Sequence, residues 1–182
     1  MAASALTSGT WNLDASHSEV GFSVRHAGIS KVRGSFTEFD ATLTVGETLA
    51  DSSVVANVQT GSVNTKDENR DGHLKSADFF DSEQFPAMTF KSTGLKGDSD
   101  EFVLVGELTI RGVAKEVELE VELGGQAVDA FGATRAGFYA TTTISRKEFG
   151  ITWNAALEAG GVLVSDKVKI EIDASFVLPA AA

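Results

Sequence analysis

The chain has 182 residues, contains no cysteine and carries a formal net charge of −11. This length fits one domain, and the absence of cysteine excludes disulfides and thiolate metal sites. The acidity argues against nucleic acid as a partner, because phosphates require a basic protein face, and against permanent adsorption to an anionic membrane.

The N-terminal sequence MAASALTSGTW lacks the basic start and the apolar run of a signal peptide. No stretch approaches the length of a transmembrane helix. We therefore expect a cytoplasmic protein without stable membrane insertion, or a periplasmic or secreted one if a leader was removed. The expected division is a flexible segment over residues 1–9, one domain over residues 10–178 and a frayed tail over residues 179–182.

Alternation of apolar and polar residues predicts strands along most of the chain. Glycine-containing turn signals separate these runs. In chain order the alternating runs are residues 20–24, 41–45, 54–58, 88–90, 103–110, 117–123, 138–144 and 168–176.

About eight antiparallel strands in one domain need protected edges, and closure into a barrel removes the edges altogether. A two-sheet sandwich is the competing architecture. The barrel is favoured by the alternation on nearly every strand and by Gly21 and Gly106 inside strands, where tight bends are expected. The interior of such a barrel holds either side chains or one ligand.

Two segments interrupt the strand pattern. Residues 66–80 predict one or two helical turns, and residues 151–161 predict a short loop or helical turn, each lying over an end of the barrel. The first segment places cationic and polar side chains directly before several phenylalanines, which suits the mouth of an apolar pocket. The alternative is a helical crossover that packs its aromatic residues into the core.

Few residues have the pattern of a catalytic or metal site. The three histidines are His17, His26 and His73, and none has a second histidine at the spacing of a metal ligand pair. His26 continues an inward strand face, either as a core residue or as part of a cavity wall. Arg146 also continues an inward face, so we expect its guanidinium at the rim in water, or else beside a carboxylate or an anionic head group. No nucleophile motif is present.

Six runs of residues resemble the YceI-like family, the bacterial polyisoprenoid-binding proteins. They follow the order of the family and together span roughly residues 10–178. The runs are residues 14–26 (DASHSEVGFSVRH), 32–36 (VRGSF), 69–80 (NRDGHLKSADFF), 85–90 (FPAMTF), 106–113 (GELTIRGV) and 145–150 (SRKEFG).

The resemblance implies an all-β fold, a single antiparallel lipocalin-like barrel of about eight strands with one or two short helical crossovers. It implies a long apolar cavity for one amphiphile, such as a polyprenyl pyrophosphate, an isoprenoid quinone or a fatty-acid derivative. It also implies a homodimer. We expect binding, storage or transport of this lipid, without enzymatic activity and without a cofactor other than the bound lipid.

The candidate site residues divide into a polar set and an apolar set. Arg70 and His73, with Lys75, His26 and Arg146 as further candidates, are expected to contact the ligand head group. Alternatively, Arg70 and Asp71 form helix-cap and ion-pair contacts that attach the crossover to the barrel. The expected apolar lining consists of Val20, Phe22, Val24, Phe36, Phe39, Phe79, Phe80, Phe85, Phe90 and Phe138.

Three other functions remain open from the sequence. An enzyme acting on the lipid would use His26 or His73 as a general base, and would need a carboxylate or hydroxyl within hydrogen-bonding distance of that imidazole. A metal- or haem-binding protein would use the histidines as ligands. A structural or interaction domain would hold no small ligand at all.

Overall fold

The computed structural model describes residues 6–158 and 160–180. The predicted flexible segment and frayed tail therefore lie partly outside the described residues. The strands are β1 (Gly9–Leu13), β2 (Glu19–His26), β3 (Ser30–Phe36), β4 (Phe39–Val45), β5 (Ser53–Gln59), β6 (Val63–Asn64), β7 (Ala87–Lys96), β8 (Glu101–Ile110), β9 (Val113–Val128), β10 (Thr134–Ser145) and β11 (Val164–Leu178). The helical elements are α1 (Glu68–Lys75) and the 3₁₀ turns η2 (Ala15–His17), η3 (Leu49–Asp51), η4 (Thr60–Ser62) and η5 (Arg146–Phe149).

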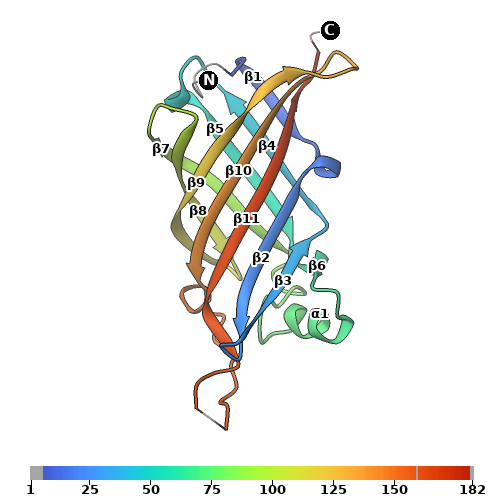
Figure 1. The fold of residues 1–182 in the computed structure, drawn as a ribbon, viewed down its shortest axis with the longest axis vertical. Coiled ribbons are helices and arrows are strands. Elements are labelled where there is room, and N and C mark those ends of the chain that lie inside the picture. Colours follow the sequence, from blue (N-terminus) through green and yellow to red (C-terminus); the bar gives the residue numbers. More distant parts are fainter. Residues whose placement is uncertain (1–5, 159, 181–182) are drawn as a thin grey trace.

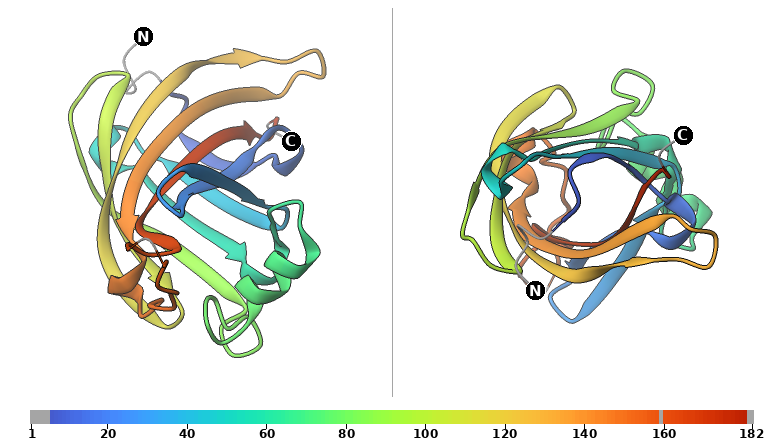
Figure 2. Two further views of the ribbon diagram at one scale, coloured as in Figure 1. Left: turned by 60° about the horizontal axis from the view of Figure 1, so that its bottom comes forward. Right: turned by 90° about the horizontal axis from the view of Figure 1, so that it is seen from above.

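The strands form one antiparallel sheet that closes on itself. Around the ring the order is β1-β4-β5-β7-β8-β9-β10-β11, and β1 pairs again with β11. Seen along its axis, the sheet encircles a central space (Figure 2). The predicted lipocalin-like barrel of about eight strands is therefore confirmed, and the two-sheet sandwich is wrong.

Each of the first two barrel strands is bent and divides into two halves, β1 with β2 and β3 with β4. Both β1 and β2 pair with β11, while β4 pairs with β1 and β3 pairs with β2. The bend between β1 and β2 is fixed by Asp14, which accepts hydrogen bonds from Ser16 and from Arg135 Nη1 at 2.9 Å. These bonds hold the pKa of the Asp14 carboxyl well below its usual range.

The end of the barrel at the bottom of Figure 1, beside α1, is called the lower end here, and the start of β1 and the end of β11 lie at the opposite, upper end. Among the described strands, β6 pairs with β3 but not with β7. Residues 65–86, which include α1, follow at this opening. Thr60 Oγ1 secures the end of this segment by donating a hydrogen bond to the Phe85 carbonyl at 2.9 Å. The helix confirms the predicted one or two turns, and residues 151–163 form the predicted loop, closed by a bridge between Ala156 and Val162.

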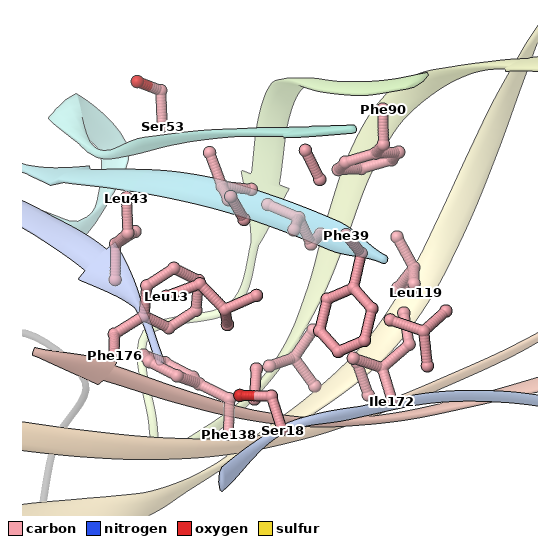
Figure 3. A pocket seen from close by; sticks show the side chains of 18 of the residues that line it. Leu13, Ser18, Phe39, Leu43, Ser53, Phe90, Leu119, Phe138, Ile172 and Phe176 are labelled. Atoms are coloured by element: carbon pink, nitrogen blue, oxygen red, sulfur yellow. The ribbon is translucent and has the colours of Figure 1, made fainter. Parts of the chain in front are cut away.

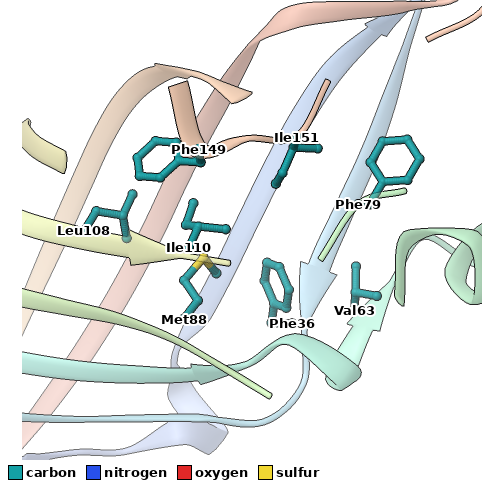
Figure 4. Packing of buried hydrophobic residues seen from close by; sticks show 8 residues of the cluster. All are labelled: Phe36, Val63, Phe79, Met88, Leu108, Ile110, Phe149 and Ile151. Atoms are coloured by element: carbon teal, nitrogen blue, oxygen red, sulfur yellow. The ribbon is translucent and has the colours of Figure 1, made fainter. Parts of the chain in front are cut away.

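A buried apolar cluster fills part of the lower half of the barrel (Figure 4). Its side chains come from β3, β6, β7 and β8, from the segment after α1, and from η5 with the residue that follows Gly150. They are Phe36, Val63, Phe79, Met88, Leu108, Ile110, Phe149 and Ile151.

Two glycines inside strands make room for phenylalanine rings. A Cβ atom on Gly34 would overlap the ring of Phe22, and one on Gly106 would overlap the ring of Phe90. Each ring therefore lies flat across the neighbouring strand, an arrangement that a larger residue would prevent. At Gly106 the register between β8 and β9 is uninterrupted, whereas the pairing of β7 with β8 shifts between Ser92 and Gly94, opposite Gly106 and Val105.

We predict that Gly34→Ala lowers the free energy of unfolding by about 1–3 kcal/mol, because the added methyl group overpacks the contact with Phe22. Gly137→Ala is the matched control, since a Cβ there meets nothing within 4 Å. Urea unfolding of both variants checks the prediction, and the double variant with Phe22→Leu should recover part of the loss. Equal stability of the two single variants would contradict it.

Candidate functional site

Two cavities occupy the interior of the described barrel, one above the other. The upper cavity has a volume of about 220 Å³ and the lower cavity about 230 Å³. Met88 and Ile170 line both of them. The two cavities are therefore neighbouring compartments of one barrel interior, separated at the level of these two side chains.

The upper cavity is walled almost entirely by carbon atoms. Its side chains come from opposite walls of the barrel and point toward a common space (Figure 3). Such a surface favours a hydrocarbon, and the two charged residues in its lining, Asp40 and Asp173, are both acidic. The residues labelled in Figure 3 are Leu13, Ser18, Phe39, Leu43, Ser53, Phe90, Leu119, Phe138, Ile172 and Phe176.

The lower cavity combines apolar walls with polar side chains. Its apolar walls come from β2, β3, the segment after α1, and the loop that contains Trp153. An interior that is apolar above and partly polar below is suited to an amphiphile. The polar and cationic residues that line the lower cavity are Arg25, His26, Thr65, Arg70, His73 and Arg146.

Arg146 is buried, with 4% of its surface exposed. Its guanidinium donates hydrogen bonds to four backbone carbonyls, those of Ile151, Trp153, Val164 and Ser165, at 2.8–3.2 Å. The expectation that this side chain stays in water at the rim is therefore wrong. Burial lowers the pKa of the Arg146 guanidinium, and the nearby Asp166 carboxylate opposes that shift. The side chain ties the loop at the lower end to the barrel and places a positive charge in the cavity wall.

Arg70 and Asp71 both contact Thr65. The Arg70 guanidinium donates to the Thr65 hydroxyl and to its carbonyl, both at 2.8 Å. The Asp71 carboxylate accepts from the Thr65 amide at 2.8 Å and from its hydroxyl at 2.6 Å. These contacts attach α1 to the barrel, as the alternative interpretation of Arg70 requires. Since Arg70 also lines the lower cavity, the contacts leave its role toward a ligand open.

His73 lies in an aromatic and acidic environment. Its Nε2 atom is 2.9 Å from Oδ2 of Asp78, and its ring meets Trp153 edge-on at a centroid distance of 4.7 Å. The carboxylate partner required by the enzyme hypothesis is therefore present at His73. By contrast, Lys75 is exposed and is not part of either cavity wall.

The other predicted residues divide between the two cavities. Val20, Phe39, Phe90 and Phe138 line the upper one, and Phe22, Val24, Phe36, Phe79, Phe80 and His26 line the lower one. Phe85 lines neither cavity, because its ring packs over Gly112.

Sequence reasoning missed several lining residues. Trp153 carries no periodic signal, since it lies in an irregular loop. Ile172 and Phe176 lie on the inward face of a predicted strand, so the alternation in residues 168–176 was a sufficient signal for them.

The remaining polar groups do not assemble into a catalytic or metal site. His17 contacts both Ser16 and Asp14, but through the same Nδ1 atom, whereas a triad uses both ring nitrogens. Within the described ranges, no group of three or more His, Asp or Glu residues is arranged to hold a metal ion. Likewise, none of the helices described there is long and apolar enough to cross a membrane.

An eight-stranded antiparallel barrel around an apolar interior defines a lipocalin-like protein. Within this class the chain belongs to the YceI-like family, whose domain matches residues 11–176. A UPF0312 protein of Staphylococcus aureus (strain USA300) is 38% identical over 170 residues, which is 91% of this chain and 96% of the relative.

Solved structures have the same fold. BcnA of Burkholderia cenocepacia, 20% identical, superposes with a TM-score of 0.78 over 90% of this chain and 98% of BcnA. The YCEI protein of Campylobacter jejuni is 29% identical and superposes with a TM-score of 0.74 over 86% of this chain and 90% of its own chain. A polyisoprenoid binding domain from Saccharophagus degradans is 13% identical and superposes with a TM-score of 0.71 over 93% of this chain and 98% of its own chain.

We predict that Arg146→Lys lowers the free energy of unfolding by more than about 2 kcal/mol, because lysine cannot satisfy four divergent carbonyls and leaves buried acceptors unpaired. Lys147→Ala, at the exposed neighbouring position, should change stability by less than about 0.5 kcal/mol. Thermal and urea unfolding provide the measurement. A stable lysine variant would show that the carbonyl contacts contribute little.

Proposed function

We propose that the barrel binds a long amphiphile, with the apolar chain of the ligand inside the two cavities. The single observation that carries the proposal is the pair of neighbouring, largely apolar cavities inside the barrel, which share Met88 and Ile170 as lining residues. The polyisoprenoid binding domain with the same fold supports a polyisoprenoid, such as a polyprenyl pyrophosphate or an isoprenoid quinone, as the ligand. A fatty-acid derivative has the same general shape.

The energetics favour a persistent complex. An isoprenoid chain that buries on the order of 500 Å² of apolar surface gains about 12 kcal/mol before the costs of binding. Lost translational, rotational and chain freedom offsets a large part of this gain. A rigid barrel with a preformed cavity limits the remaining cost, because the protein needs little reordering.

The head group of the ligand belongs at the lower end. The upper cavity offers carbon walls, whereas His26, Arg70 and His73 line the lower one. Arg146 adds a buried positive charge, but its guanidinium donates its hydrogen bonds to backbone carbonyls, so its contribution to an anionic head is electrostatic. Cytoplasmic storage or transport by a homodimer is the form of this function that the sequence predicts.

A second candidate function is an enzyme that acts on the same ligand. The His73–Asp78 pair favours it, because a carboxylate that orients an imidazole is the usual support of a general base. Binding remains the preferred function, since both members of the pair are about half exposed, at 40% and 50%, and water is not excluded from them. Recovery of an intact ligand favours binding, and recovery of a converted one favours catalysis.

We predict that Ala140→Trp reduces the amount of lipid retained during purification at least about tenfold, because the indole fills space in the upper cavity and removes apolar contact with the ligand. Ala140 is 9% exposed and lines that cavity. Solvent extraction followed by mass spectrometry measures the lipid per barrel.

The matched control is Thr143→Trp, which places the same side chain at an exposed position of the same strand. It should retain the lipid of the unaltered protein. Circular dichroism establishes that both variants are folded. An empty unaltered protein, or full retention by folded Ala140→Trp, would contradict the proposal.

A further prediction concerns the head group. His26→Gln should weaken binding of geranylgeranyl pyrophosphate by roughly 10- to 100-fold through loss of a charge-assisted hydrogen bond. Binding of geranylgeraniol, which has the same chain without the charged head, should be unchanged. His17→Gln removes an exposed histidine outside both cavities and serves as the control. Equal losses of affinity for geranylgeranyl pyrophosphate and geranylgeraniol would show that His26 does not contact the head group.

A further inference from the structure

Positive charge is concentrated on one outer face of an otherwise acidic protein. Residues 20–37 contain no Asp or Glu, although the whole chain has 26. Pairing between β2 and β3 sets Arg25 opposite Lys31 and Ser23 opposite Arg33. On the other side of β2, Lys169 of β11 lies opposite Ser23. The basic face defined by this register consists of the exposed residues Arg25, Lys31, Arg33, Lys167 and Lys169.

Two exposed aliphatic side chains lie at the end of this face. Ile29, at the tip of the hairpin between β2 and β3, is 86% exposed. Ala27 and Gly28 precede it in the left-handed region, with φ of 53° and 72°, so the turn is tight. The Ala27 amide donates to the Leu163 carbonyl at 2.7 Å, which holds the loop carrying Val162, 51% exposed, against the hairpin.

The same elements form the wall of the lower cavity. Val24 and His26 from β2, and Leu163 and Val164 from the loop and β11, all line it. The tip of the hairpin therefore lies at the same end of the barrel as the lower cavity.

We propose that the lower end of the barrel docks on the surface of an anionic phospholipid bilayer, with Ile29 and Val162 entering the interface and the basic face meeting the lipid head groups. The proposal extends the proposed function, because a bilayer is a source of a long apolar ligand. Its physical basis does not require that function, since it rests on charge and exposure alone.

The combination of charge and apolar tip selects this partner. Cationic side chains are attracted to anionic lipid head groups, and aliphatic side chains at a tip gain by entering the boundary between head groups and acyl chains. A nucleic acid would use the cations but would leave Ile29 and Val162 in water.

Several acidic groups oppose docking and make it reversible. Glu171 is paired with Lys169 at 3.2 Å, Glu158 is exposed in the loop beside the hairpin, and Glu148 is exposed on η5. The segment that contains α1, at the same end of the barrel, adds four exposed acidic residues, Asp67, Glu68, Asp78 and Glu83. The net charge of −11 also repels the rest of the molecule from the membrane. Docking is therefore confined to one end of the barrel and weakens as salt screens the basic face.

The test is sedimentation of the full chain with vesicles. Vesicles of phosphatidylserine and phosphatidylcholine are compared with vesicles of phosphatidylcholine alone, at low and high salt. We expect the unaltered protein to bind the anionic vesicles at least about tenfold more strongly at low salt. Lys31→Gln combined with Arg33→Gln should weaken this binding about 25-fold, because each lost charge accounts for about fivefold. Ile29→Ser should weaken it about tenfold or more.

Matched controls separate the basic face from total charge and total exposure. Lys91→Gln combined with Lys115→Gln makes the same change in net charge at exposed positions of β7 and β9. Phe131→Ser removes a 94% exposed apolar side chain from the turn between β9 and β10. Neither control should change vesicle binding, and thermal unfolding establishes that every variant is folded.

The outcomes distinguish docking from ligand binding. Lipid extracted from each variant reports on the cavity, and sedimentation reports on the surface. Loss of docking in the Lys31/Arg33 and Ile29 variants, with retained lipid, supports the inference. An empty barrel that still docks on anionic vesicles refutes the proposed function but leaves the docking surface in place. Absence of anionic preference, or equal losses in the controls, overturns the docking proposal.

Discussion

Closure of the sheet between β1 and β11 is the contact on which the rest of this structure depends. It is short, joining Asn12 to Val177 and Leu13 to Phe176, yet it turns an open sheet into a ring whose upper half has no free edge. A ring of eight strands encloses an interior that side chains can fill or that can hold one ligand, and in this barrel two cavities remain between the inward side chains. The apolar interior therefore remains partly empty, and this empty space is what a ligand would occupy.

Regular strand pairing is incomplete at the lower end of the barrel. Because β6 does not pair with β7 among the described strands, that end is completed by residues 65–86 and by the loop after η5 rather than by a regular ladder. Side chains replace backbone pairing there: Arg70 and Asp71 hold α1 through Thr65, and Arg146 holds the loop through four carbonyls. The polar groups that hold the lower end together therefore lie in the part of the barrel where an amphiphile would place its polar head.

Charge is also distributed unevenly over the molecule. The chain is strongly acidic as a whole, which keeps it soluble, while the hairpin between β2 and β3 is free of acidic residues and ends in Ile29. A protein that collects a long apolar ligand must approach a lipid surface without remaining on it. In the proposed docking, repulsion of most of the molecule combined with attraction at one end would meet both requirements.

The sequence alone predicted the eight strands with clear alternation, a helical turn within residues 66–80 and most inward-facing residues, because alternation with a period of two is a local property of the chain. It did not predict β1, β3 and β6. Only the tertiary structure decided that Arg146 is buried, since two of its acceptor carbonyls lie in the irregular segment after η5 and two at the start of β11, and only the folded chain brings these two places together. It also decided that Phe85 packs on Gly112 instead of lining a cavity, and that Met88 and Ile170 divide the interior. These facts depend on the curvature of the closed sheet, which brings together residues that lie far apart in the chain.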